Sequence, residues 1–280
     1  MASPTRAGDA GSLPTPETVY SVYQQLMVLG GGAAGVGSIG LGGRLVLYDV
    51  VDLAGAATAL AASIAGAASL GIDPDVERLK QAVRSGVCDF VVNGLDEAVR
   101  ILKNEIRKKN TVAVGLGADL AACLAEIVER GLQPDVLAFP MGRADEAAID
   151  SSLDILKQRG ALSVATPVEA RMLALSSLAR VRWSVPDSPA RWLPKLTAIA
   201  AHAVAGGASP GDDRLRWLRL LPRYFPRAAY HFVPMSEVEV EEFLSGVREH
   251  TASGAIPCAV TVERDDALEQ RGVEVSQWGT

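Results

Sequence analysis

The sequence is poor in the residues that build metal sites and disulfide frameworks. It has three histidines and three cysteines in 280 residues, and the cysteines lie far apart at Cys88, Cys123 and Cys258. This spacing fits neither a zinc site nor a set of disulfides, so we expect no metal site. A small, odd number of cysteines suits a reducing compartment, and we therefore expect a cytoplasmic protein.

Positive charge is also scarce. Lysine and arginine total 27 residues against 33 for aspartate and glutamate, which gives a net charge of −6. A nucleic-acid surface needs clustered basic side chains to displace counterions. We therefore expect no nucleic-acid partner. The most basic stretch, residues 214–227, predicts a solvated or interface helix, with an anion site as the alternative.

Long hydrophobic runs are missing as well. The longest apolar stretch, residues 53–70, is rich in alanine and contains Gly55, Thr58, Ser63 and Gly66. A transmembrane helix would be richer in leucine, isoleucine and phenylalanine. The first 16 residues have no apolar core of the kind found in a secretory signal. The pattern therefore predicts a soluble chain with no membrane partner.

Apolar, β-branched runs alternate with helical patterns through the first half of the chain. Five buried strands are expected, over residues 44–51, 68–72, 89–92, 111–116 and 135–139. Helix-like stretches with short loops separate them, and a further helix is expected over residues 18–29. Repeated βα steps of this kind predict an α/β fold with a doubly wound, parallel, Rossmann-like sheet.

The pattern changes in the second half. We expect a mobile tail over residues 1–16, the Rossmann-like domain over 17–145, and an α/β extension or second small, α-rich domain over 146–280. Helices are expected over residues 147–159 and 167–178, and strands over 161–164 and 258–262. Ser236 with Glu239 forms a capping-box pattern that predicts a helix to about residue 250.

A glycine-rich segment, residues 30–43, has two interpretations. Gly30, Gly32 and Gly35 form a GxGxxG pattern after an apolar run, and Asp49 ends the next expected strand. This arrangement is typical of an NAD- or FAD-dependent oxidoreductase. The helix that must follow would be short and would contain several glycines, each costing about 1 kcal/mol relative to alanine. The alternative interpretation is a glycine-rich connection.

The chain from Leu41 to Phe139 carries a more specific pattern. It contains the stretches LGGRLVL, ALAASIAGAASLGID, GLDEAVRIL and LAEIVERGLQPDV. In these stretches it resembles the NAD-binding domain of urocanase (urocanate hydratase). The resemblance implies a Rossmann-like fold with NAD as the cofactor. It also implies hydro-lyase chemistry, in which the nicotinamide acts as an electrophile towards an imidazole-type substrate.

The resemblance also implies a set of cofactor-binding residues. Asp73 falls on the acid that holds the adenosine ribose, and Arg78 on the arginine that follows it. Of the family's glycine-rich turn only Gly55 is kept, and Asp119 stands where the family has asparagine. The alternative roles are a helix cap for Asp73 and a surface position for Arg78.

The strand pattern itself places a crevice at the carboxyl ends of the strands. We expect this crevice to be lined by Asp52, Gly55, Asp73, Gly117 and Asp119.

The chain also departs from the urocanase pattern. The family's nicotinamide-side residues fall on 140–144, which read PMGRA, and residues 150–280 do not resemble the family's remaining part. Three functions follow from these patterns. They are a urocanase-related hydro-lyase that binds NAD or a nucleotide-like ligand, a non-catalytic relative that senses a small molecule or forms a homo-oligomer, and an oxidoreductase that uses the segment from Gly30 to Asp49. No catalytic residue can be assigned from the sequence.

Overall fold

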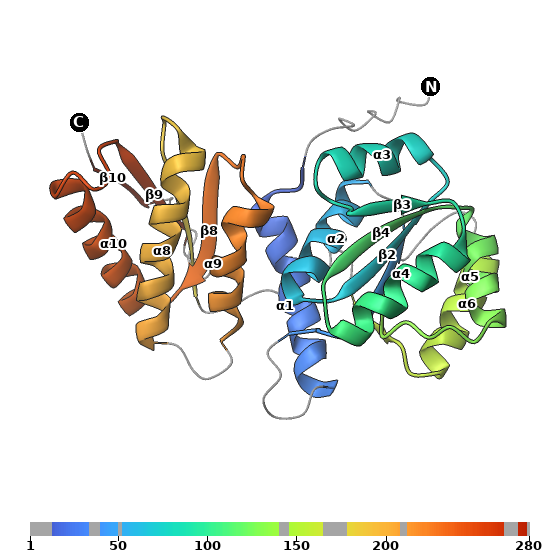
Figure 1. Ribbon diagram of the computed structural model, residues 1–280. Helices are drawn as coiled ribbons and strands as arrows, with labels where there is room; N and C mark the ends of the chain where they lie inside the picture. The colour runs from blue at the N-terminus through green and yellow to red at the C-terminus, as the bar shows by residue number, and fades with distance from the viewer. Residues whose placement is uncertain are drawn as a thin grey trace, which may run out of the picture. The chain divides into compact units, whose positions relative to one another are not determined.

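The computed structural model describes residues 13–33, 40–49, 52–139, 146–164, 178–207, 212–265 and 274–278. Its contacts divide the chain into two compact units, Met1–Met172 and Leu173–Thr280 (Figure 1). Among the described residues, no helix has the length and apolar character needed to cross a membrane.

The first unit is a six-stranded parallel sheet in the order β3-β4-β2-β1-β5-β6. This confirms the predicted Rossmann-like class and the parallel pairing of all five expected strands. The strands are β1 (Leu45–Asp49), β2 (Ala68–Asp73), β3 (Phe90–Val92), β4 (Val112–Gly117), β5 (Val136–Ala138) and β6 (Leu162–Ser163). The helices are α1 (Pro16–Ala33), α2 (Leu53–Ala65), α3 (Val76–Arg84), α4 (Leu95–Lys108), α5 (Leu120–Glu129) and α6 (Glu146–Gln158).

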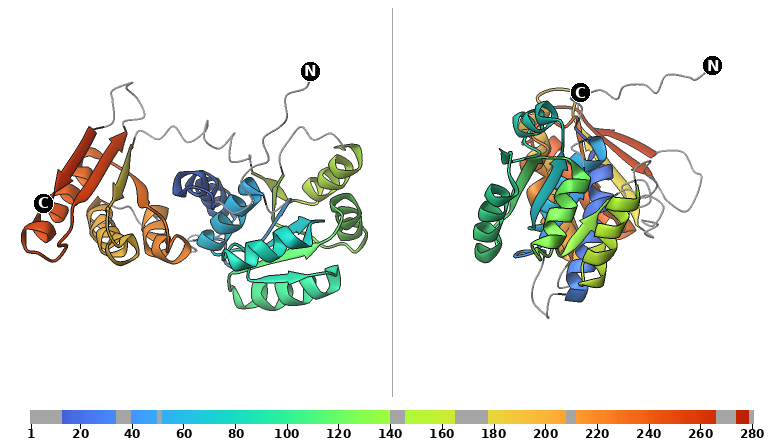
Figure 2. Two further views of the ribbon diagram at one scale, coloured as in Figure 1. Left: turned by 90° about the horizontal axis from the view of Figure 1, so that it is seen from above. Right: turned by 90° about the vertical axis from the view of Figure 1, so that its right-hand side faces the viewer.

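Helices cover both faces of this sheet, as the unbroken apolar strands require. Side chains of α4, α5 and α6 join those of β1, β2 and β4 in one hydrophobic cluster. Right-handed crossovers place α2 and α3 on one face of the sheet and α4 on the other. Figure 2 shows α3 and α4 on opposite sides of the sheet. In α4, Leu95, Ala98 and Leu102 recur at helical spacing and are buried against the sheet.

A close approach between β1 and β2 requires a glycine. Gly71 pairs with Tyr48 across the two strands. A β-carbon built on Gly71 would lie 2.5 Å from the Tyr48 ring, which is itself completely buried. The small-residue strand therefore makes room for a large aromatic side chain in the core.

Of the two interpretations of the glycine-rich segment, the dinucleotide fingerprint at Gly30 and Gly32 is wrong. The apolar run before these glycines is the helix α1, which continues to Ala33, so no strand precedes the pattern. Val19 and Tyr23 lie on one face of α1 and are fully buried, and α1 packs against α2. Burial of this face outweighs the cost of glycine at the end of the helix. Gly35 lies outside the described residues.

The division between the units falls after Met172, later in the chain than the expected boundary near residue 145. The reason is that β6 pairs with β5, so the helix and strand predicted over residues 147–164 complete the first sheet. Of the helix expected over residues 167–178, residues 167–177 lie outside the described residues, as do residues 1–12 of the tail expected over residues 1–16. Pro16, the last residue of the expected tail, begins α1.

The second unit is a four-stranded sheet in the order β10-β9-β7-β8, with antiparallel neighbours. Trp183, Trp217 and Phe243 are fully buried in it. The predicted capping box at Ser236 and Glu239 is confirmed at the start of α10. The elements are β7 (Ala179–Ser184), α8 (Pro189–Gly207), α9 (Asp213–Tyr224), β8 (Tyr230–Met235), α10 (Glu237–Ala252), β9 (Val260–Asp265) and β10 (Glu274–Trp278).

Candidate functional site

The carboxyl ends of the parallel strands bring most of the expected site residues to one edge of the first sheet. Asp73 ends β2 and pairs directly with Gly117, which ends β4. Asp52 follows the neighbouring strand β1, and Asp119 follows Gly117. Each strand end leads into a helix whose first N–H groups face this edge, which is where doubly wound sheets bind ligands.

Asp52 caps the helix that would hold a pyrophosphate. One oxygen of its carboxylate accepts hydrogen bonds from the backbone N–H groups of Ala54 and Gly55, both at 2.9 Å. These N–H groups begin α2, and Gly55 is buried. The carboxylate therefore takes the position and the donors that a bound anion would need.

Asp73 is sealed inside the protein. Its side chain is 0% exposed, and its Oδ1 accepts from the Asp75 backbone N–H and from the guanidinium of Arg78, both at 2.8 Å. Arg78 itself is about half exposed and covers the carboxylate. The hydrogen bond to Asp73, with the charges of Asp73, Asp75 and Asp52, raises the pKa of Arg78, against a smaller opposing effect of burial.

Two further aspartates cap helices at the same edge. Asp75 accepts from the N–H groups of Glu77 and Arg78 at the start of α3. Asp119 accepts from the N–H of Ala122 at the start of α5. The first turns of α2, α3 and α5 are therefore all bound to the chain's own carboxylates.

Gly117 is partly exposed and lies close to two neighbouring side chains. A β-carbon there would lie 3.3 Å from both Asn93 Oδ1 and Val76 Cγ2. Asn93 thus belongs to this edge of the sheet, although the sequence analysis missed it. The signal was available, because Asn93 is the first polar residue after the strand β3.

The residues present do not fit a tightly held dinucleotide. A pyrophosphate at α2 would have to displace Asp52 from two hydrogen bonds and would meet the negative charge of that carboxylate. A ribose could reach Asp73 only if Arg78 moved away from it. The segment 140–144, expected on the nicotinamide side, lies outside the described residues.

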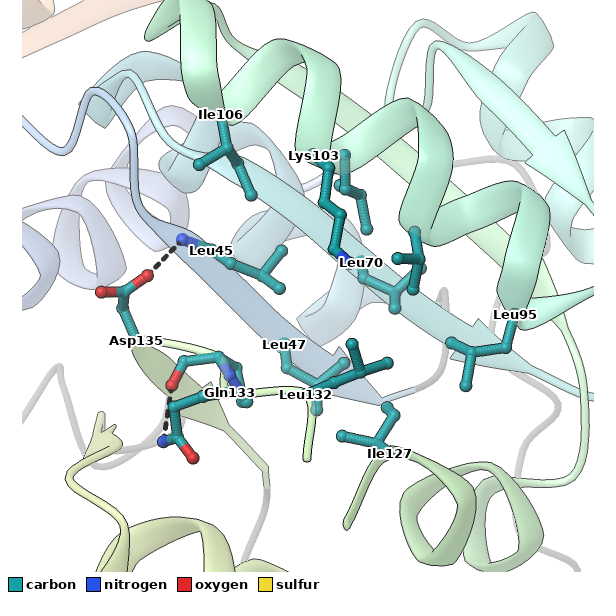
Figure 3. Close-up of a pocket in the computed structure, with 13 residues that line it drawn as sticks. Leu45, Leu47, Leu70, Leu95, Lys103, Ile106, Ile127, Leu132, Gln133 and Asp135 are labelled. Atoms are coloured by element: carbon teal, nitrogen blue, oxygen red, sulfur yellow. Dashed lines mark hydrogen bonds between the residues drawn. The ribbon is translucent and has the colours of Figure 1, made fainter. Parts of the chain in front are cut away.

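The expected crevice at this edge stays a prediction, because residues 50, 51 and 140–145 lie outside the described part of the chain. Within the described part of the first unit, two hollows lie elsewhere. One is a groove lined by Phe90 of the edge strand β3 and by Arg100 of α4. The other is an apolar cavity between α4 and α5, drawn in Figure 3.

The described residues contain two buried thiols and no cluster of metal-ligating side chains. Cys88 and Cys123 are buried, and burial raises the pKa of each thiol to about 11. Both therefore stay protonated and unreactive near neutral pH. No group of three or more histidine, cysteine, aspartate or glutamate side chains within the described ranges could hold a metal ion.

Arg214, in the basic stretch of the second unit, is the centre of a largely buried ion-pair cluster that the sequence did not reveal. The Arg214 guanidinium contacts Glu239 at 2.7 and 2.9 Å and Asp212 at 2.7 Å. Asp212 caps α9, and Glu239 also accepts from the Ser236 N–H at 2.7 Å. Arg214 therefore ties together the starts of α9 and α10, so its role is structural.

The fold and this edge define the first unit as a Rossmann-like α/β domain. Residues 23–139 match the family model described as the urocanase Rossmann-like domain. The match begins within α1 and ends just after β5. This part of the chain, 117 of the 280 residues, is therefore similar to the urocanase Rossmann-like domain.

Proposed function

We propose that this protein is a non-catalytic urocanase relative that binds a small, nucleotide-like ligand weakly and does not hold NAD tightly. The observation that carries the proposal is the cap on α2. Asp52 occupies the two backbone N–H groups that a dinucleotide pyrophosphate would otherwise take. A bound diphosphate gains its affinity from such donors, so their internal use removes the main anchor.

The remaining affinity lies with the adenosine end. Asp73 and Arg78 stand at the positions that the urocanase resemblance assigns to ribose binding, and they contact each other at 2.8 Å. Ribose hydroxyls can bond to Asp73 once the half-exposed Arg78 swings away. We therefore expect ADP-ribose to bind as well as NAD, because the nicotinamide half adds nothing to this contact.

The test is a binding experiment on the purified full chain. Protein denatured after purification should release far less than one equivalent of NAD, measured by ultraviolet absorbance and mass spectrometry. Calorimetry should then give similar, weak affinities for NAD and ADP-ribose. Asp73→Asn should abolish both. Asp154→Asn removes an exposed carboxylate from α6 and should leave both unchanged.

The competing function is a urocanase-related hydro-lyase, which the retained pair Asp73 and Arg78 favours. The NAD released from the purified chain distinguishes this hydro-lyase from the non-catalytic relative. Tight NAD in stoichiometric amount, together with loss of urocanate absorbance above a control without protein, would replace our proposal with the enzyme. We expect no such loss, because hydration requires the nicotinamide to be held beside positioned acids and bases.

The proposal also covers the cellular location and the oligomeric state of the protein. Three free thiols among the described residues are compatible with a reducing, cytoplasmic location. Self-association into a homo-oligomer completes the proposal, since a non-catalytic relative can keep its fold for assembly. Light scattering coupled to size-exclusion chromatography measures the mass directly, and a monomer at all concentrations would remove this part.

A further inference from the structure

The first unit contains an apolar cavity away from the carboxyl edge of its sheet. Its volume is about 180 Å³, and it lies over the starts of β1 and β2, between α4 and the end of α5 (Figure 3). Leu47 and Leu70 form its floor and are almost fully buried. Val99, Ile106 and Leu132 line it as well and are only partly buried.

An aliphatic cavity of this size is suited to an apolar guest. Cavities of about 150 Å³ lined by such side chains stay dry and accept benzene-sized molecules. Side chains around an empty space also lose dispersion contacts, which a ligand would restore. The cavity in this protein is slightly larger and should take an aliphatic tail of about six to eight carbons.

Three polar side chains also line the cavity, and two of them are hydrogen-bonded to other groups of the chain. Asp135 is paired with Arg44 at 2.6 Å and accepts from the Leu45 N–H at 2.8 Å. The Gln133 amide donates to two backbone carbonyls. Lys103, on α4, is the exception: it is exposed and has no ion-pair partner among the described residues. Figure 3 shows its side chain descending from α4 beside the cavity.

We propose that this cavity binds an amphipathic monocarboxylate, with its aliphatic tail among the leucine side chains and its carboxylate on Lys103. An apolar interior with one free ammonium group favours a single negative headgroup over a neutral or positive one. This site is separate from the edge that carries Asp52 and Asp73, so the inference goes beyond the proposed function and does not depend on it.

Calorimetry of the full chain with octanoate tests the site. We expect saturable binding of one octanoate per chain, weakened about fourfold for each methylene removed from the acid. Lys103→Gln should weaken octanoate by about tenfold, the size of one charge-assisted contact, and should leave 1-octanol unchanged. The matched control Lys108→Gln removes a lysine of the same helix that pairs with Glu105 and does not line the cavity, and it should change neither ligand.

A second variant fills the space itself. Val99→Trp places a large ring at the partly buried wall of the cavity and should abolish binding of both octanoate and 1-octanol, with an unchanged circular dichroism spectrum. Three results would overturn the proposal. They are the absence of saturable octanoate binding, equal losses in Lys103→Gln and Lys108→Gln, and binding of octylammonium as tight as that of octanoate.

Discussion

Removing the Asp52 carboxylate should create the anion site that the wild-type chain lacks. Two substitutions separate the two effects of this side chain. Asp52→Ser keeps a capping oxygen and removes the charge, whereas Asp52→Gly removes both and frees the N–H groups of Ala54 and Gly55. The cap position has extended backbone angles that both replacements adopt.

The expected gain follows from the contacts. A carboxylate about 4 Å from a phosphate costs roughly 1 kcal/mol in water, so Asp52→Ser should tighten ADP-ribose binding about fivefold. Each freed N–H that bonds to a phosphate adds a charge-assisted hydrogen bond of about 1.5 kcal/mol or more. Asp52→Gly removes the charge and also frees two N–H groups, which together amount to about 4 kcal/mol, so it should tighten binding by about 1,000-fold. Its cost in stability is a few tenths of a kcal/mol, because glycine is a tolerated cap.

Calorimetry with ADP-ribose and with inorganic pyrophosphate measures the gain. Asp75→Gly is the local control, because Asp75 caps α3 at the same edge with the same kind of hydrogen bonds. It should give only the small, charge-related improvement. An affinity of Asp52→Gly equal to that of the wild type would show that α2 does not present its N–H groups to an anion, and our reading of this edge would be wrong.

Three other predictions concern stability. Gly71→Ala should destabilise the first unit by about 2 kcal/mol, seen as a lower melting temperature, because its β-carbon would lie 2.5 Å from the Tyr48 ring. Burial lowers the pKa of His231 from 6.5 to about 4, so between these pH values the unfolded chain binds a proton that the folded chain does not. The free energy of unfolding of the second unit should therefore be highest above about pH 6.5. It should fall by up to about 3 kcal/mol as the pH drops to 4. A double-mutant cycle on Arg214 and Glu239 should give a coupling of about 2 kcal/mol by urea unfolding, because the pair is almost buried.

Each of these has a matched control. Gly94→Ala introduces a β-carbon where nothing lies within 4 Å, so it should cost much less than Gly71→Ala. His202 is exposed, and its replacement by asparagine should leave the pH dependence intact. A cycle on the exposed pair Asp154 and Lys157 should give well under 1 kcal/mol. Equal effects in test and control would contradict the corresponding packing, protonation or ion-pair argument.

The parallel sheet was predictable because its strands are buried on both faces. Runs such as residues 44–51 and 111–116 are apolar without alternation, which leaves few other structures open to them. The glycine pattern at Gly30 misled for a physical reason. Val19 and Tyr23 of α1 are fully buried and α1 packs against α2, so the helix continues into glycines whose own preference is for turns.

The second sheet and the details of the site depend on partners distant in sequence. β7 alternates arginine with Val181 and Trp183, and its partners β8 and β9 come about 50 and 80 residues later. The resemblance to urocanase assigns Asp73 and Arg78 to the adenosine end of a cofactor site. It does not predict that the two side chains contact each other at 2.8 Å. The local sequence gives the position of a carboxylate in the chain, whereas the side chain that pairs with it depends on the folded geometry.

The place of β1 in the sheet has a consequence for synthesis of the chain. β1 precedes the other strands of this sheet in the chain, yet it lies inside the sheet with β2 on one side and β5 on the other. Leu45 contacts Asp135, 90 residues later, and ribosomes add about 5 to 20 residues each second. One edge of β1 therefore waits about 5 to 20 s for its neighbour, with an apolar strand open to other chains. A nascent chain stalled before β5 should be the aggregation-prone form of this protein.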